Sequence, residues 1–178
     1  KMSNLKKYKM FIGGEWVESE SKKTFKTLNP ENNEAWAEVP EANAKDVGKA
    51  VEAAQRAFEG DWPNLFARER ANYLRKIANE LRDNAEHLGK IETIDTGKLF
   101  KETKTQAHYI AEYYDYYAGL ADKVEGTVLP IDKSNMQVIT TRVPIGVVAA
   151  IIPWNSQMLL TAVKLAPALA MGNSVVIK

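Results

Sequence analysis

The sequence predicts an α/β protein, and three observations support this fold class. Short runs of alternating apolar and polar residues between positions 8 and 39 are typical of strands. Apolar residues at helical spacing follow between positions 47 and 118. A strand–helix–strand pattern between positions 147 and 178 then predicts a β-α-β unit with a parallel sheet.

The first elements are short strands. The stretch from Tyr8 to Val17 alternates around Gly13-Gly14, a pair that can adopt the positive φ angles of a two-residue hairpin turn. Two more strands are predicted from the strand-like runs Phe25 to Leu28 and Ala35 to Val39. Asn29-Pro30 ends the first run, and Pro40 ends the second. The chain therefore opens with a hairpin and two further strands.

Four helices are predicted next. The first begins after the N-cap Asn43 and carries an apolar face made of Val47, Val51, Ala54 and Phe58. Two further helical stretches meet near Asn84 and end at Thr96-Gly97, and a fourth runs from Lys101 to about Ala121. The tyrosines between Tyr109 and Tyr117 could stack on nucleic acid. The helix lacks a basic stripe, however, so we predict packing in a core or an interface.

A second hairpin is predicted after Gly126. The stretches from Thr127 to Leu129 and from Met136 to Val143 read as strands with a polar face. A hairpin that projects beyond the helices can add its edge to a neighbouring subunit, so an oligomerisation arm is one hypothesis. An ordinary surface hairpin is the alternative.

The last section contains the candidate ligand site. The continuous apolar run from Val147 to Ile152 predicts a strand buried on both faces of a parallel sheet. A helix from about Met158 to Met171 and a second strand from Ser174 follow. Ligands bind outside the carboxyl ends of such strands, where the sequence has Pro153, Trp154, Asn155 and Lys178. The G-x-G-x-x-G fingerprint is missing, so spacing alone does not identify the ligand.

Composition excludes several classes of protein. Lys and Arg total 24 against 23 Asp and Glu, and the net charge of +1 gives no general attraction to nucleic acid or to an anionic membrane. The apolar stretches are too short for a membrane span, so we expect a soluble, cytoplasmic protein. The chain has no Cys, which excludes disulfides and a cysteine nucleophile within these residues.

Several motifs resemble the aldehyde dehydrogenase superfamily. They are Pro144-Ile145-Gly146-Val147-Val148, Ile152-Pro153-Trp154-Asn155 and the stretch from Lys164 to Lys178. The stretches Phe11 to Trp16, Leu28 to Pro30 and Glu92 to Lys98 are also similar to that family, so the resemblance covers nearly the whole chain. It implies oxidation of an aldehyde to a carboxylic acid through a cysteine thiohemiacetal, with hydride transfer to NAD or NADP.

The resemblance also implies roles for individual residues. Asn155 matches the asparagine whose NH₂ group stabilises the oxyanion, although a helix cap is the alternative. Lys178 matches the lysine that hydrogen-bonds the adenosine ribose, although an exposed strand-end lysine is the alternative. The residues that match other contacts along the dinucleotide are Ile151, Ile152, Pro153 and Trp154.

Two further features follow from the resemblance. Some members of the family hold a monovalent cation with backbone carbonyls and one aspartate, and Thr27 or Leu28, together with Asp95, match those ligands. Asp95 could equally be a turn residue. Ser156-Gln157 replaces the usual Phe-Pro beside the oxyanion site, which weakens any inference about the aldehyde.

The resemblance divides the chain into three segments. Residues 1–125 are the N-terminal part of a cofactor-binding domain, 126–144 are the arm, and 145–178 begin a Rossmann-like β-α-β unit. The family's catalytic cysteine, general-base glutamate and nicotinamide loop lie beyond Lys178, so the catalytic domain is absent and this segment alone is expected to be inactive. The intact protein is expected to be a homodimer or homotetramer. The alternatives are a truncated homologue that binds nucleotide and an assembly protein.

Overall fold

The computed structural model describes residues 5–178, so the first four residues of the predicted segment 1–125 lie outside it. Its N-terminal strands are β1 (Lys6–Lys7), β2 (Met10–Ile12), β3 (Glu15–Val17), β4 (Thr24–Asn29) and β5 (Glu34–Pro40). The predicted hairpin is confirmed as β2 and β3, and its turn residues Gly13 and Gly14 have φ angles of 62° and 88°.

The other N-terminal strands form a three-stranded sheet in the order β1-β5-β4. Strands β4 and β5 are antiparallel, as expected for two runs joined by a short turn, and β1 pairs with β5 in parallel. Strand β1 was not predicted, because two consecutive lysines carry no alternation of apolar and polar residues.

Helix α1 (Ala44–Glu59) begins at the predicted N-cap. The Asn43 side chain accepts from the backbone N–H groups of Lys45 and Asp46, and Asp46 accepts from the Asn43 backbone in return. That backbone hydrogen bond from Asn43 lowers the pKa of the Asp46 carboxyl. The apolar face of α1 is only partly covered, since Val47 and Val51 are 52% and 41% exposed.

Three helices and α5 (Gln157–Ala170) form the core. The turn η1 (Trp62–Asn64) leads into α2 (Ala67–Asp83), α3 (Ala85–Thr96) and α4 (Phe100–Leu120). The predicted break at Asn84 and the stop at Gly97, whose φ is 76°, are both confirmed. Helix α4 packs against α2, α3 and α5, and the buried residues at these contacts include Leu74, Ile110, Tyr114 and Ala166.

Small residues let these helices approach one another closely. A Cβ atom at Gly89 would lie 2.8 Å from the backbone nitrogen of Lys104 on α4. Among the tyrosines of α4, Tyr114 is 3% exposed, and burial raises its pKa to about 12. The predicted core packing is therefore confirmed for Tyr114. Tyr109 and Tyr116 are 56% and 61% exposed, and interface packing by these two stays a prediction.

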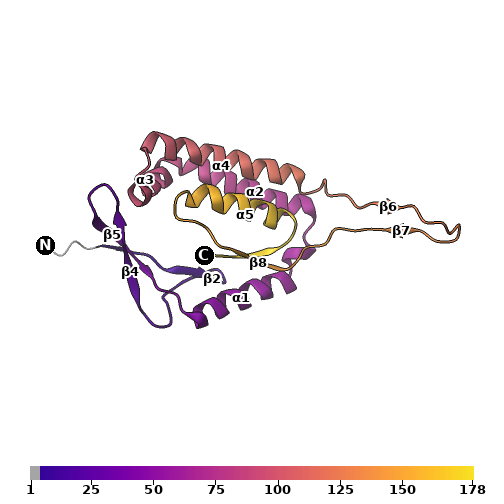
Figure 1. The fold of residues 1–178 in the computed structure, drawn as a ribbon, viewed down its shortest axis with the longest axis horizontal. Helices are drawn as coiled ribbons and strands as arrows, with labels where there is room; N and C mark the ends of the chain where they lie inside the picture. Colours follow the sequence, from indigo (N-terminus) through magenta and orange to yellow (C-terminus); the bar gives the residue numbers. More distant parts are fainter. Residues whose placement is uncertain (1–4) are drawn as a thin grey trace.

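The second hairpin projects far beyond the helices (Figure 1). It contains β6 (Val128–Leu129) and β7 (Val138–Ile139), which pair in antiparallel fashion. Both strands are shorter than predicted, because the hairpin is exposed along nearly its whole length and packs against no other element that the structure describes. At its base, the Thr127 carbonyl accepts from the Thr140 backbone N–H at 2.8 Å.

The predicted β-α-β unit is confirmed as β8 (Val147–Ala150), α5 and β9 (Ser174–Ile177). The parallel pair β8–β9 contacts α5 and α1, and it lies between these two helices in Figure 1. The prediction that the run from Val147 to Ile152 is buried on both faces is wrong. Ala149 is exposed within β8, and Ile151 is 73% exposed because the strand stops at Ala150 and Ile151 belongs to the loop that follows.

A helix that crosses a membrane needs about 20 predominantly apolar residues. None of the helices within residues 5–178 is both long enough and apolar enough to do so.

Candidate functional site

The carboxyl ends of β8 and β9 meet at one edge of the two-stranded sheet. The backbone N–H of Lys178 donates to the Ala150 carbonyl at 2.9 Å, and the Lys178 carbonyl accepts from Ile152 at 2.7 Å. Lys178 therefore lies beside the loop of residues 151–156, which connects β8 to α5. Of the sequence-predicted residues of this loop, Ile152 contacts Lys178 directly, as expected for parallel strands, and the loop continues through Pro153, Trp154 and Asn155 to α5.

Most side chains of this loop are exposed. Ile151 and Trp154 are 73% and 78% exposed, and Pro153, Asn155 and Lys178 are exposed as well, whereas Ile152 is half-buried. Exposed apolar side chains next to a neutral amide and an ammonium group can contact a base and donate to ribose or carbonyl oxygens. The arrangement offers donors and an apolar surface but no thiol nucleophile, because the chain has no Cys.

A buried asparagine fixes the opposite ends of the two strands. The Asn173 Oδ1 atom accepts from the backbone N–H groups of Ile145 and Gly146 at 2.7 and 3.1 Å, and its Nδ2 donates to the Ala168 carbonyl at 3.2 Å. This role of Asn173 was not predicted from the sequence. The feature that could have indicated it is the position of Asn173 directly after Gly172, which follows the end of α5 and has a φ of 84°.

Two sets of polar contacts fix the first turn of α5. In the first, which we call the Lys98 clamp, the Lys98 ammonium donates to Ser156 Oγ and lies 3.2 Å from Glu92 Oε1. In the second, the Asp95 clamp, Gln157 Nε2 donates to Asp95 Oδ2 at 2.9 Å, and Thr27 Oγ1 donates to Asp95 Oδ1 at 2.6 Å. The clamps connect α5 to the C-terminal part of α3 and, through Thr27, to β4.

The predicted cation ligands are therefore partly brought together. Thr27 and Asp95 are in direct contact, and both oxygens of the Asp95 carboxylate accept from protein donors. Leu28 follows Thr27 on β4 and is 46% exposed. The described residues contain no group of three or more His, Cys, Asp or Glu side chains suited to a metal ion.

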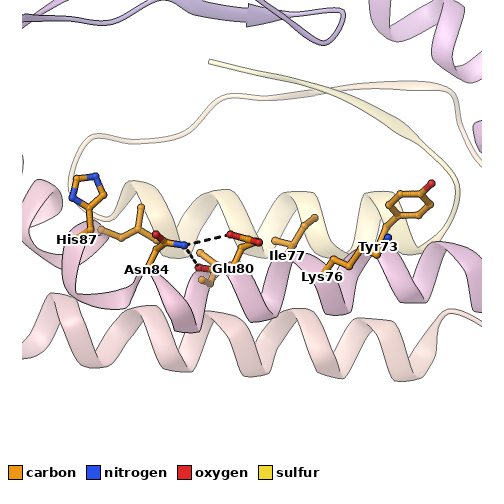
Figure 2. Close-up of a pocket in the computed structure, with 8 residues that line it drawn as sticks. Tyr73, Lys76, Ile77, Glu80, Asn84 and His87 are labelled. Carbon is orange, nitrogen blue, oxygen red and sulfur yellow. Dashed lines mark hydrogen bonds between the residues drawn. The ribbon is translucent and has the colours of Figure 1, made fainter.

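A hollow lies elsewhere, along α2 and the start of α3 (Figure 2). It has a volume of about 470 Å³, and its lining includes Tyr73, Ile77 and His87. Its polar contacts are internal, since Asn84 Nδ2 donates to the Glu80 carbonyl at 2.9 Å. The lining shares no residue with the loop of residues 151–156, and the structure does not connect the hollow with the candidate site.

Comparison with known proteins gives consistent matches. A model of the aldehyde dehydrogenase family matches residues 16–178. (Z)-2-((N-methylformamido)methylene)-5-hydroxybutyrolactone dehydrogenase from Acinetobacter baylyi is 46% identical over 175 residues, which are 98% of this chain and 36% of that protein.

Solved structures match over nearly the whole chain. One is a double mutant of betaine aldehyde dehydrogenase from Staphylococcus aureus in complex with NAD⁺, which superposes with a TM-score of 0.91 at 38% identity. The match covers 99% of this chain and 35% of the chain of that enzyme. A 3,6-anhydro-L-galactose dehydrogenase in complex with NADP gives 0.92 at 34% identity, over 97% and 36% of the two chains. The chain thus spans about a third of the length of its relatives.

Proposed function

The chain belongs to the aldehyde dehydrogenase family, and we propose that it forms the N-terminal part of an enzyme that oxidises an aldehyde to a carboxylic acid with NAD or NADP. The observation that carries the proposal is the contact between the loop of residues 151–156 and Lys178 at the carboxyl ends of β8 and β9. Relatives of the same fold in complex with NAD⁺ and NADP support the cofactor.

The exposed residues at this edge fit a dinucleotide. The Lys178 ammonium can donate to the hydroxyls of the adenosine ribose, and the neighbouring contacts would come from Ile151, Ile152, Pro153 and Trp154. When bound, the oxidised nicotinamide supplies the hydride acceptor. The residues of this chain hold the cofactor and exclude water from one side of it.

Asn155 is the proposed oxyanion donor. It follows the dinucleotide contacts directly, it is exposed, and its side-chain NH₂ group can stabilise negative charge on the aldehyde oxygen without adding a titratable group. The nucleophile and the general base would come from residues that are not in this chain, since the chain has no Cys. Residues 1–178 alone are therefore expected to give no turnover.

Further features of the intact enzyme stay predictions. They are the division into segments 1–125, 126–144 and 145–178, a homodimer or homotetramer joined through the arm, and a cytoplasmic location. A monovalent cation at Thr27, Leu28 and Asp95 is also a prediction.

The test is NAD(P)H formation by the full-length protein with a series of aliphatic and aromatic aldehydes. Asn155→Ala should lower kcat about 10²- to 10³-fold, as expected for one lost oxyanion donor. Asn72→Ala, which changes an exposed asparagine on α2, is the matched control and should keep normal turnover. If the parent protein binds nucleotide but oxidises no aldehyde, a non-catalytic homologue replaces this proposal. If Asn155→Ala keeps full turnover, its role as oxyanion donor is wrong.

A further inference from the structure

The first turn of α5 lacks the local restraint that usually fixes the start of a helix. Ser156 occupies the N-cap position, yet its side chain makes no capping hydrogen bond to the backbone of α5. Its Oγ atom accepts from the Lys98 ammonium instead. The backbone from Ile151 to Asn155 precedes this turn and is mostly exposed, so it receives little support from its own packing.

The two clamps supply the missing restraint from distant parts of the chain. Lys98 and Ser156 are 58 residues apart in sequence, and Asp95 and Gln157 are 62 residues apart. The far side of each clamp is itself fixed, because Glu92 is 4% exposed and pairs with Lys98, while Thr27 on β4 donates to Asp95. Charge-assisted hydrogen bonds of this kind are stronger and more directional than neutral ones.

We propose that Lys98 and Gln157 are positioning residues for the reaction. They act through Ser156 and Asp95 to hold the start of α5, and with it the Asn155 amide, in a fixed place relative to the reacting carbonyl. The inference rests on the proposed function, since it assigns the clamps to the oxyanion donor of that reaction. Misplacing a catalytic group by about 1 Å can cost up to about 100-fold in rate, so two contacts adjacent to Asn155 can matter.

Incomplete hydrogen bonding within the clamps favours a role in positioning over one in stability. Glu92 Oε2 and Gln157 Oε1 are buried and have no hydrogen-bond partner among residues 5–178. A buried acceptor without a partner costs about 1–3 kcal/mol, and a buried ion pair adds little net stability. The unpartnered acceptors therefore offset part of the free energy that the clamps contribute to folding. The clamps still fix the geometry of the turn.

The experiment uses the full-length protein with the variants Gln157→Leu and Lys98→Met, which keep the side-chain size and remove the donors. The matched controls are Gln55→Leu and Lys90→Met, which remove a Gln–carboxylate hydrogen bond of 2.7 Å and a Lys–carboxylate pair of 2.8 Å on exposed helix faces. Lys98→Arg keeps a cationic donor and tests rescue. Three quantities are measured, namely kcat and KM for aldehyde and nucleotide, the melting temperature, and hydrogen–deuterium exchange of residues 151–157.

Each clamp variant should lower kcat about 10-fold with KM for the nucleotide changed by less than about twofold, because the turn is misplaced while the cofactor contacts persist. The melting temperature of Gln157→Leu should change by less than about 3 °C, whereas Lys98→Met leaves the buried Glu92 carboxylate without its cation and should melt at a lower temperature. Exchange of residues 151–157 should become faster in both variants. Lys98→Arg keeps the cation and should recover most of the activity and of the melting temperature. The controls should match the parent in all three measurements.

Unchanged kcat and unchanged exchange in both clamp variants would overturn the proposal. A fall in kcat of Gln157→Leu that merely follows a lower melting temperature would also overturn it, because a structural role explains that result. If the parent protein has no turnover, the proposed function fails. The exchange of residues 151–157 then still decides whether the clamps hold the loop.

Discussion

Helix α5 is held in different ways at its two ends. Towards its C-terminus, Ala166 and Ala170 are buried against the other helices, and Arg70 Nε donates to the Ala170 carbonyl at 3.1 Å. At its N-terminus, the first turn is fixed by the Lys98 and Asp95 clamps, whose members are only partly buried apart from Glu92. The C-terminal end is therefore fixed by buried small residues and a bond from Arg70 to the backbone, whereas the N-terminal end combines the partly buried Met158 and Leu159 with the polar side chains of the clamps.

This difference separates stability from position. Burial of apolar side chains contributes free energy in proportion to the area removed from water and fixes orientation only through close packing. For buried polar and charged groups, the cost of desolvation offsets much of the free energy that their hydrogen bonds and ion pairs contribute, whereas the geometry of these bonds fixes direction. The packed end of α5 should therefore govern unfolding of the domain, and the polar end should govern where Asn155 lies. Substitutions at the two ends can test this separation.

The largest effect is expected for Leu74→Ala. Leu74 is fully buried between α2 and the other core helices, and removing such a side chain costs about 2–5 kcal/mol of unfolding free energy. Urea denaturation of the full-length protein measures this loss. Leu99→Ala, at a position that is 69% exposed, is the control and should change stability little. Stability and position are not separate if the folded Leu74→Ala enzyme loses kcat by an amount that, expressed as a free energy, is as large as its loss of unfolding free energy.

A smaller loss of about 1–3 kcal/mol is expected for Asn173→Ala, because the N–H groups of Ile145 and Gly146 lose a common acceptor in the interior. These bonds lie at the amino ends of β8 and β9, away from Asn155. Turnover should therefore stay within about threefold of the parent. Asn64→Ala is the control, since exposed Asn64 makes one hydrogen bond of 3.0 Å to the Gly60 carbonyl. A large loss of kcat with normal stability would show that both strand ends position the site.

Much of the fold could be predicted from the sequence. The turn at Gly13-Gly14, the cap at Asn43 and the stops at Gly97 and Gly172 are local features, and each lies within the residues that specify it. The β-α-β unit followed from two apolar runs around a helical pattern. That unit then located Lys178 beside the start of the loop that leads to Asn155, because parallel strands place their carboxyl ends together.

The remaining features depend on contacts that no local pattern contains. The Lys98 and Asp95 clamps join positions about 60 residues apart, and neither Ser156 nor Gln157 shows from its neighbours which group it contacts. The predicted burial of Ile151 failed for a related reason. A continuous apolar run does not show where its strand ends, and β8 stops at Ala150, so Ile151 lies in the exposed loop.

The most direct test of the central claim is hydrogen–deuterium exchange of the full-length protein with and without NAD⁺ or NADP⁺. The account predicts slower exchange at residues 151–156 and 174–178 when the dinucleotide binds, because these segments form the carboxyl ends of β8 and β9. Residues 126–144 of the arm should exchange at the same rate in both states. Nucleotide binding that protects other segments and leaves residues 151–156 and 174–178 unchanged would contradict the account.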